Sequence, residues 1–470
     1  MNGLSIPAIF KKNYIKYALF IPALIILGAS LAIYADSPFL IVPLLGILAL
    51  TSFSALNIAL YILVATLPFS FRFIMTSGTE MQVPTEPLLA IMAGAFALRW
   101  IVLKSRGVKI GFPFKLPMLL YSAGICLSLI NTTHLYASIK GSFRALVYMM
   151  LSVIVFSIIN DRQKLKRFFI IAMVSGTIAV GWTAIFLIDR IEMWRWTTAY
   201  EGTPFTSYAH YGSFVVVILF ILLARMIYDR GVYDRVIWSG LTVFYIVAIC
   251  LCFSRGVWLS FIISMGFLLI QRSEGVKNKK MLIAGAFVLL FVVLISIPQV
   301  SDVIISRAST IFSLKYGTNK ERLLRWATAI AMFERHPILG AGYGSFAFSY
   351  INDPAILGRV SKYGMGAHSE YLQVLSETGL IGFIGWMWII VSFFLYGFRL
   401  LNKLGLKSEN MLWRSLAIGI MSAELALLIH FLVNNLIQTY IVGIPFWILM
   451  GMLPAIGNIA ESENEALKNK

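Results

Sequence analysis

The sequence predicts an all-α polytopic membrane protein with about 12–14 transmembrane helices and one large extracytoplasmic helical loop. Hydrophobic residues make up 59% of the 470 residues, charged residues make up only 13%, and the mean hydropathy is +0.84. Apolar runs long enough to cross about 30 Å of hydrocarbon recur along the chain. Because these runs are continuous rather than alternating, they favour helices over a transmembrane barrel.

The apolar runs also locate the predicted spans. We expect helices near residues 17–34, 38–53, 55–70, 88–104, 115–131, 143–159, 168–188, 212–228, 236–252, 256–271, 280–298, 378–400, 412–434 and 439–457. Two tightly spaced pairs, 38–53 with 55–70 and 236–252 with 256–271, account for the lower limit of the expected number.

Lysine and arginine gather in alternate connections between these spans, and such residues mark the cytoplasmic side of a membrane protein. The basic residues in question are Lys11, Lys12, Lys16, Arg99, Lys104, Arg106, Lys109, Arg162, Lys164, Lys166, Arg167, Arg230, Arg235, Arg272, Lys277, Lys279, Lys280, Arg399, Lys403 and Lys407. Both termini are therefore predicted to be cytoplasmic and the connection 299–377 extracytoplasmic. The net charge of +18 then reflects topology and contact with anionic membrane lipids, and no nucleic-acid partner is expected.

The spans and the long connection are predicted to form one integral membrane domain. Residues 1–298 and 378–470 contain the transmembrane helices, with a short cytoplasmic tail, and residues 299–377 form a loop with interfacial helices. This loop is unusually basic for an outer connection, with Arg307, Lys315, Lys320, Arg322, Arg325, Arg335, Arg359 and Lys362. It is either a solvated loop balanced by acidic residues or a site for an anion such as phosphate.

Within the loop, Glu321–Arg335 has helical periodicity, with an apolar stripe and with Arg322 and Arg325 towards a polar side. Such a helix can lie in the membrane interface. His336-Pro337 is expected to end it, because the residue before proline avoids the α-helical region. The glycine-rich stretch 340–344 lacks the spacing of a dinucleotide-binding motif and is read as a turn close to another backbone.

His368 precedes an apolar-polar run that leads into the next span. Ser369 is a plausible cap for a short helix through Glu377, which would place His368 at the start of that helix, at the mouth of the membrane. A histidine there can act in catalysis or merely hydrogen bond to a carbonyl group.

Four arginines lie in other predicted outer turns. Arg255 lies between two apolar runs, where a guanidinium is costly unless it is paired, faces an aqueous cavity or snorkels to the interface. Arg144 has the same interpretations. Arg190 and Arg195 share a connection with Trp194 and Trp196, which an aromatic belt partly explains.

Three motifs occur in order: Ser254-Arg255-Gly256, then Arg322-x-x-Arg325-Trp326 leading to His336-Pro337-x-x-Gly340-x-Gly342-x-Gly344, then His368-Ser369-x-Tyr371-Leu372 followed by Glu377-Thr378-Gly379-x-x-Gly382. This combination, over roughly residues 200–400, resembles the O-antigen ligase and O-antigen polymerase family of bacterial membrane glycosyltransferases. His368 matches the family's loop histidine, Arg255 its Ser-Arg-Gly pattern, and Arg322 and Arg325 its helix before the glycines. The family often has asparagine where this chain has Ser369.

The resemblance implies a glycan donor carried on undecaprenyl diphosphate at the outer face of the bacterial inner membrane. The acceptor would be another glycan or the lipid A core. The lipid diphosphate is already a stable leaving anion, so the reaction needs cations around it and a base on the attacking hydroxyl. We expect His368 to be the base, Arg255 to hold the diphosphate with Arg322 or Arg325, and Glu370 or Glu377 to orient His368 or the acceptor. Arg144 and Arg195 are further candidates for diphosphate binding. With five histidines and no carboxylate cluster of metal-site spacing, neither a metal nor another cofactor is expected.

The sequence leaves several functions open. The number of spans slightly favours a polymerase over a ligase to lipid A core or protein. A flippase or transporter for lipid-linked oligosaccharide would need charged or broken helices near the membrane midplane, where only Glu424 and His430 lie deep in a late span. A non-catalytic assembly protein would not need a basic outer loop beside His368.

Overall fold

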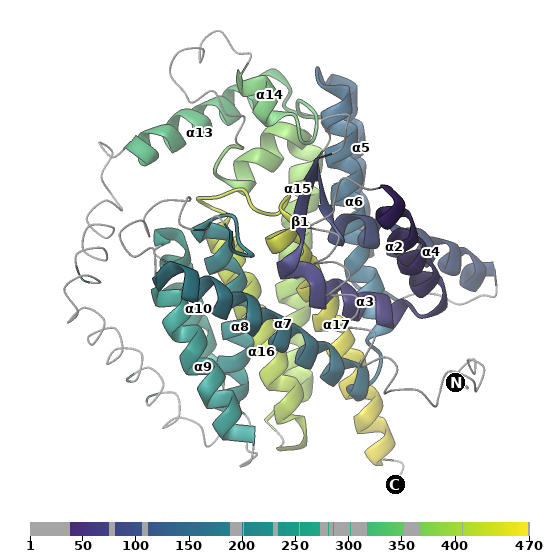
Figure 1. The fold of residues 1–470 in the computed structure, drawn as a ribbon, viewed down its shortest axis with the longest axis vertical. Helices are drawn as coiled ribbons and strands as arrows, with labels where there is room; N and C mark the ends of the chain where they lie inside the picture. Colours follow the sequence, from purple (N-terminus) through teal and green to yellow (C-terminus); the bar gives the residue numbers. More distant parts are fainter. Residues whose placement is uncertain are drawn as a thin grey trace. The chain divides into compact units, whose positions relative to one another are not determined.

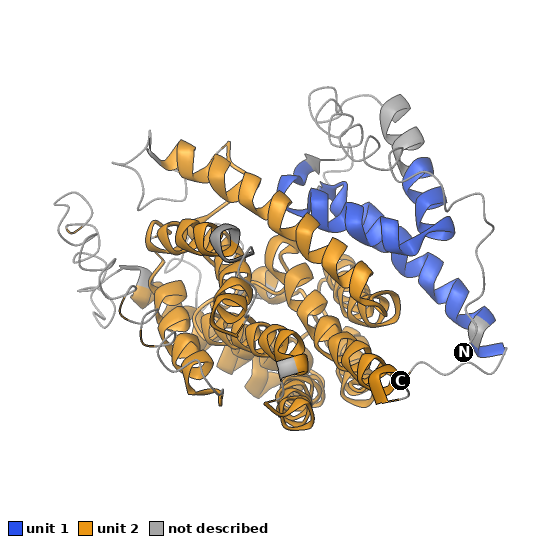
Figure 2. Ribbon diagram, turned by 90° about the horizontal axis from the view of Figure 1, so that it is seen from below, with its two compact units in different colours: residues 1–106 blue, residues 107–470 orange. Residues whose placement is uncertain are grey.

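The computed structural model describes residues 38–74, 80–105, 111–188, 200, 202–228, 234–252, 254–272, 281, 285, 301, 317–351, 366–406 and 408–468. They are almost entirely helical, as predicted (Figure 1). The chain divides into two compact units, residues 1–106 and 107–470, which Figure 2 shows in different colours.

The first unit contains three described helices and a β-hairpin. Its elements are α2 (Pro38–Ser54), α3 (Leu56–Thr66), the 3₁₀ turn η2 (Leu67–Phe69), β1 (Phe71–Ile74), β2 (Glu80–Val83) and α4 (Thr85–Ser105). The strands pair antiparallel, with Phe71 opposite Val83. The hydropathy pattern did not predict this hairpin, because it lies in a short connection between two apolar runs.

The second unit contains the remaining elements. They are α5 (Lys115–Ser128), η3 (Leu129–Asn131), α6 (Leu135–Ile158), α7 (Arg162–Ile188), α8 (Tyr208–Tyr228), α9 (Asp234–Cys250), α10 (Arg255–Ile270), α13 (Gly317–Arg335), α14 (Phe346–Ile351), α15 (Glu370–Leu404), η6 (Ser408–Asn410), α16 (Met411–His430) and α17 (Tyr440–Lys468).

The helices agree with the predicted spans. Every predicted range from 38–53 to 256–271, and from 378–400 to 439–457, overlaps a described helix, whereas 17–34 and most of 280–298 lie outside the described residues. Seven described helices are long and apolar enough to cross a membrane, and four shorter helices are also apolar. On α7, Ile170, Val174, Ile178 and Ile185 are exposed along one face, as expected of a surface that meets lipid.

Helix α17 is longer than its predicted span, which ended at residue 457, since it continues to Lys468. A hydropathy pattern locates only the apolar part of a helix, so it cannot show where a helix with a polar end stops. The extra turns carry acidic side chains that reach basic residues: Glu461 lies 2.7 Å from Lys403 on α15, and Glu463 lies 3.7 Å from Arg162 on α7. Both basic residues belong to connections predicted to be cytoplasmic.

Helix α15 is kinked at Gly379, which has a φ of 62°. The kink separates a first segment, which starts beside His368, from the long apolar segment predicted as a span. The apolar segment packs along α5, while α16 packs along α8 and α10, and α17 packs along α6. Trp386 is fully buried in this bundle and stacks on Phe446 of α17. The kink therefore places a short helix on top of a tightly packed span.

Candidate active site

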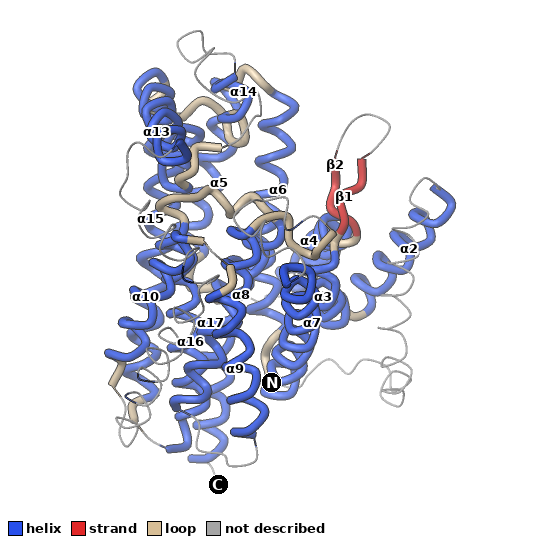
Figure 3. The backbone as a smooth tube through the Cα atoms, turned by 60° about the vertical axis from the view of Figure 1, so that its left-hand side comes forward, coloured by secondary structure: helices blue, strands red, loops and turns tan. Residues whose placement is uncertain are grey.

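Several helix ends meet at one end of the second unit, where α13 lies beside the first segment of α15 (Figures 1 and 3). Helices α8, α10 and α15 begin there, and α16 ends there with His430. A loop of residues 431–439, here called the α16–α17 loop, follows it. These ends belong to the connections that the distribution of lysine and arginine assigned to one side of the membrane.

Helix α13 confirms the helix predicted over Glu321–Arg335 and begins slightly earlier, at Gly317. It ends at Arg335, as His336-Pro337 predicted. Its buried side includes Thr328, Ala329 and Met332, whereas Leu323 and Ile330 of the predicted apolar stripe are 44% and 46% exposed. The apolar stripe thus faces away from the protein, as an interfacial helix requires.

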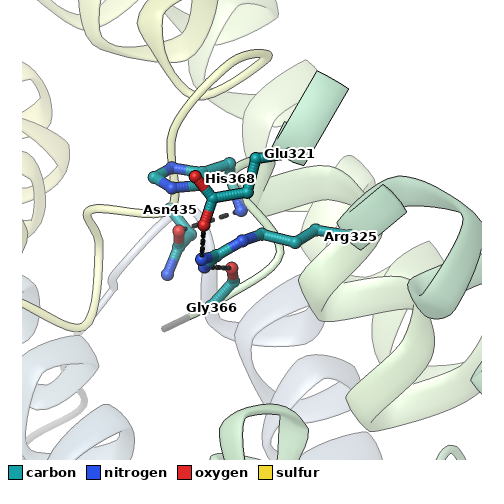
Figure 4. Close-up of polar contacts among 5 residues, drawn as sticks. All are labelled: Glu321, Arg325, Gly366, His368 and Asn435. Atoms are coloured by element: carbon teal, nitrogen blue, oxygen red, sulfur yellow. Dashed lines mark hydrogen bonds and ion pairs between the residues drawn. The ribbon is translucent and has the colours of Figure 1, made fainter. Parts of the chain in front are cut away.

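Arg325 lies on the polar side of α13, opposite the apolar stripe, as predicted, but this side faces the protein, and the Arg325 side chain is 0% exposed. Its Nη1 donates a 3.0 Å hydrogen bond to the Gly366 carbonyl oxygen, and its Nη2 forms an ion pair with Glu321 (Figure 4). A buried guanidinium is stable only when its charge and its donors are satisfied in this way. Arg325 therefore ties α13 to the segment that carries His368.

The backbone of His368 is held on both sides. Its N–H donates to Asn435 Oδ1 at 3.1 Å, and its carbonyl oxygen accepts from Trp326 Nε1 at 3.4 Å. His368 also has a φ of 53°, a left-handed conformation that is uncommon outside glycine. Such a conformation persists only where the surrounding structure enforces it. Here the hydrogen bonds from α13 and to the α16–α17 loop do so.

Ser369 occupies the N-cap position of α15, as predicted, but its side chain makes no capping hydrogen bond. The first free N–H of the helix, that of Glu370, instead donates to the Phe431 carbonyl oxygen at 2.8 Å. A carbonyl oxygen of another loop thus accepts the hydrogen bond from a free helix N–H that the side chain of a cap residue normally accepts. The start of α15 is bound to the α16–α17 loop.

Arg255 begins α10 and reaches α13, where its Nη2 donates to Asn319 Oδ1 at 3.2 Å. Asn319 lies one helical turn before Arg322. Burial and the neighbouring Arg255 guanidinium both lower the pKa of Arg322, partly offset by Tyr208 and Glu321, so the two arginines lie close enough to repel each other. Two neighbouring guanidinium groups favour the binding of an anion between them.

The imidazole of His368 lies close to the charged side chains of α13. Burial, Arg325 and Arg322 together lower the pKa of His368 to about 4, against weaker opposing effects of Glu321 and a hydrogen bond with the Asn434 side chain. The ring is therefore neutral at pH 7 and able to accept a proton. The structure thus brings His368, Arg255, Arg322 and Arg325 together around α13.

Glu370 and Glu377 are both buried and make hydrogen bonds to other parts of this end of the unit. Glu370 Oε2 accepts from Ile437 N at 3.3 Å. Glu377 Oε1 accepts from Phe346 N at 3.0 Å, and its Oε2 accepts from Gln438 Nε2 at 3.3 Å. Both carboxyl groups therefore hold neighbouring segments in place.

The glycine-rich stretch 340–344 is a turn close to another backbone, as predicted. Ala341 N donates to Ser376 O and Gly342 N to Glu377 O, both at 3.0 Å. At the kink opposite, a β-carbon on Gly379 would lie 2.3 Å from the Ile338 carbonyl oxygen. Both the positive φ and this close approach require glycine there.

The remaining predicted arginines are less closely tied to His368. Arg144 Nη1 donates to the Gln438 carbonyl oxygen at 3.5 Å and lines a small cavity with Tyr121, Tyr148 and Tyr343. It therefore contacts the α16–α17 loop. Arg195 lies outside the described residues, as do Arg190 and, in the basic loop, Arg307, Lys315, Arg359 and Lys362.

Sequence reasoning missed the asparagines of the site. Asn319 binds Arg255, Asn435 binds His368, and Asn434 lies beside the His368 ring. The adjacent pair Asn434-Asn435 between two apolar runs was a usable signal, because amides are costly beside a membrane span unless they have partners. Among the residues that the structure describes, no three or more His, Cys, Asp or Glu side chains group so that they could hold a metal ion.

A comparison with protein families agrees with this geometry. Residues 240–387 match the family model described as O-antigen ligase. Over this stretch the chain is similar to O-antigen ligases. The matched region runs from α9 into α15 and includes Arg255, α13 and His368, so the predicted resemblance to the O-antigen ligase and polymerase family is confirmed. The α16–α17 loop lies beyond the matched region, although it completes the surroundings of His368. No curated protein matches the chain.

Proposed function

We propose that the protein is a membrane glycosyltransferase that transfers a glycan from undecaprenyl diphosphate to an acceptor hydroxyl at the outer face of the bacterial inner membrane. The convergence of His368 with Arg255 and Arg322 around α13 carries this proposal. The similarity to O-antigen ligases supports the reaction class. The distribution of lysine and arginine supports the outer side, because this end of the bundle is opposite the basic connections.

In the proposed reaction, one nitrogen of His368 removes the proton from the acceptor hydroxyl. The oxygen forms a bond to the anomeric carbon of the donor while the bond from that carbon to the diphosphate oxygen breaks, which inverts the anomeric centre. The electron pair leaves on undecaprenyl diphosphate. Arg255 and Arg322 bind this diphosphate and stabilise its growing charge. No step requires a metal ion.

The other charged residues act by positioning. Arg325 is committed to Glu321 and Gly366 and holds the segment before His368. Glu370 and Glu377 hold the α16–α17 loop, and Glu377 also holds the start of α14. Arg144 supports that loop from α6. These contacts keep a neutral base and two cations at a fixed separation, which an inverting transfer requires.

The test uses purified protein in nanodiscs with a defined lipid-linked oligosaccharide. His368→Ala should lower transfer by roughly 10²–10⁴-fold, the usual contribution of a general base. His336→Ala, at the end of α13, is the matched control and should transfer at close to the wild-type rate. Wild-type transfer by His368→Ala at equal protein level would refute the base assignment. Loss of transfer with a chelator would refute the metal-independent mechanism.

The same purified protein, reconstituted into sealed vesicles with the donor on one side, separates the remaining candidate functions. Chain extension without any other acceptor indicates an O-antigen or exopolysaccharide polymerase, which is the function we favour. Transfer that depends on added lipid A core or protein indicates a ligase. Movement of the lipid across the membrane without bond formation indicates a flippase, and would overturn the proposal.

A further inference from the structure

His210 lies in the first turn of α8, and the proposed reaction does not use it. Its Nδ1 lies 2.7 Å from Thr206 Oγ1 and 3.0 Å from Ser207 Oγ. Its Nε2 is buried but has no hydrogen-bond partner among the residues that the structure describes. Because a buried polar atom is costly unless it is hydrogen bonded, Nε2 is a candidate contact for a substrate.

The contacts of Nδ1 bear on which ring nitrogen of His210 carries the proton. Ser207 Oγ accepts a hydrogen bond from the His210 backbone N–H at 3.3 Å, so its own proton is available to Nδ1. A neutral imidazole whose Nδ1 accepts carries its proton on Nε2, and an imidazolium ion carries a proton on both nitrogens. In either of these states Nε2 is a hydrogen-bond donor, which suits an anionic oxygen.

The first turns of α8 and α10 pack against each other (Figure 1). Glycine permits this approach, since a β-carbon on Gly212 would lie 2.7 Å from Val257 Cγ2. A β-carbon on Gly256 would lie 2.8 Å from His430 Cδ2, and His430 Nδ1 lies 2.8 Å from Ser213 Oγ. The His430 ring therefore contacts α8 at Ser213 and α10 at Gly256.

These contacts set the level of His210 relative to Arg255. Both helices begin at the same end of the unit, so they run in the same direction. His210 precedes Ser213 by three residues, which places it on the same face of α8, about 4.5 Å further out along the helix axis. Arg255 directly precedes Gly256, and its guanidinium reaches α13. His210 and Arg255 therefore lie on the same side of the His430 ring, on two helices in contact.

We infer that His210 is a further donor-binding residue, whose Nε2–H donates a hydrogen bond to a phosphate oxygen of the lipid diphosphate beside Arg255 and Arg322. The inference rests on the proposed function, in which these two arginines bind the diphosphate. Arg322 and His210 both lie close enough to His430 to affect its electrostatic environment. A hydrogen bond to an anionic oxygen is stronger than one between neutral groups, and the positive end of the α8 dipole favours the same charge.

A structural role for His210 would use its other nitrogen. The ring would then only close the turn before α8 through Thr206 and Ser207, and Nε2 would have no function. Two substitutions separate these roles. In His210→Asn the amide oxygen lies near the position of Nδ1 and can accept from the same hydroxyls, whereas in His210→Gln the longer side chain places an amide N–H near the position of Nε2.

The experiment measures the donor KM in nanodiscs and, separately, the binding of undecaprenyl diphosphate to the same protein. His210→Asn should weaken this binding and raise the donor KM by roughly 10-fold or more, the usual effect of losing a hydrogen bond to a charged group. His210→Gln should stay closer to wild type in both measurements. His336→Asn, the same substitution at the end of α13, is the matched control and should leave both unchanged.

The order of the two His210 variants decides the inference. Weaker binding by His210→Asn than by His210→Gln supports it. Equal effects of the two variants, the reverse order, or wild-type binding by His210→Asn would overturn it. If Arg255→Lys weakens binding and His210→Asn does not, the inference fails while the proposed function stands. If the wild-type protein neither binds undecaprenyl diphosphate nor transfers glycan, the proposed function fails and the inference fails with it.

Discussion

Arg325 Nη1 and the Gly366 carbonyl oxygen lie 3.0 Å apart, which joins a fully buried guanidinium to the backbone two residues before His368. We assign a structural role to this buried charge, because binding an incoming anion would require it to give up its two partners, which is energetically costly. In the proposed reaction, binding of the diphosphate is therefore left to Arg255 and Arg322. The arginines of the motif then divide into one that builds the site and two that we propose bind the substrate.

Arg325→Lys should destabilise the loop and lower kcat, because a single ammonium group cannot bridge Glu321 and Gly366 in the geometry of the guanidinium fork. We expect a loss of about 2 kcal/mol in the free energy of unfolding, below the range for fully enclosed pairs since Glu321 is 35% exposed. Thermal unfolding in detergent measures it. An unchanged melting temperature would show that the ion pair does not hold the segment.

Arg255→Lys and Arg322→Lys should instead raise the KM for the lipid-linked donor, by roughly 10-fold each, because a point charge does not reproduce a bidentate contact to phosphate oxygens. Arg335→Lys, at the exposed end of α13, is the matched control. Donor titrations at saturating acceptor separate KM from kcat. Equal effects of all three substitutions would indicate general electrostatics rather than a defined diphosphate site.

The pH dependence of kcat/KM should show an acid limb near pH 4, because burial and the arginines of α13 lower the pKa of His368 to about 4 in the free protein. Bound diphosphate offsets the arginines, so the acid limb of kcat should lie at higher pH. An acid limb of kcat/KM near pH 6.5 would contradict the buried environment of this imidazole.

The same titration affects stability. Between pH 6.5 and about 4 the unfolded chain binds a proton at His368 that the folded chain does not, so stability falls as the pH is lowered through this window. His368→Gln should remove this part of the pH dependence of the melting temperature.

Gly379→Ala should impair folding of the kink, because the added β-carbon meets the Ile338 carbonyl oxygen at 2.3 Å and the φ of 62° disfavours alanine. Gly405→Ala, also at a positive φ but with no atom within 4 Å, separates the steric effect from the conformational one. A lower melting temperature and weaker transfer are expected of Gly379→Ala beyond those of Gly405→Ala. Equal behaviour of the two variants would contradict the docking of the glycine turn.

The side of the membrane can be tested by labelling in a background with Cys126, Cys250 and Cys252 replaced. Ile338→Cys, beside the glycine turn, should react with a membrane-impermeant maleimide from outside intact inner membranes, whereas Leu467→Cys, near the end of α17, should react only after lysis. Both positions are exposed, at 61% and 58%. The reverse pattern would invert the predicted orientation.

The sequence by itself determined the membrane class, most spans, the α13 helix and its end at His336-Pro337, because hydropathy, helical period and proline chemistry act over a few residues. It also singled out His368 and Arg255 through local motifs. Only the tertiary structure decided which arginine is buried and which asparagines surround the histidine. Arg325 hydrogen bonds to Gly366 across 41 residues, and His368 hydrogen bonds to Asn435 across 67 residues. Such pairings depend on which helix ends meet in space, and no local sequence pattern determines that.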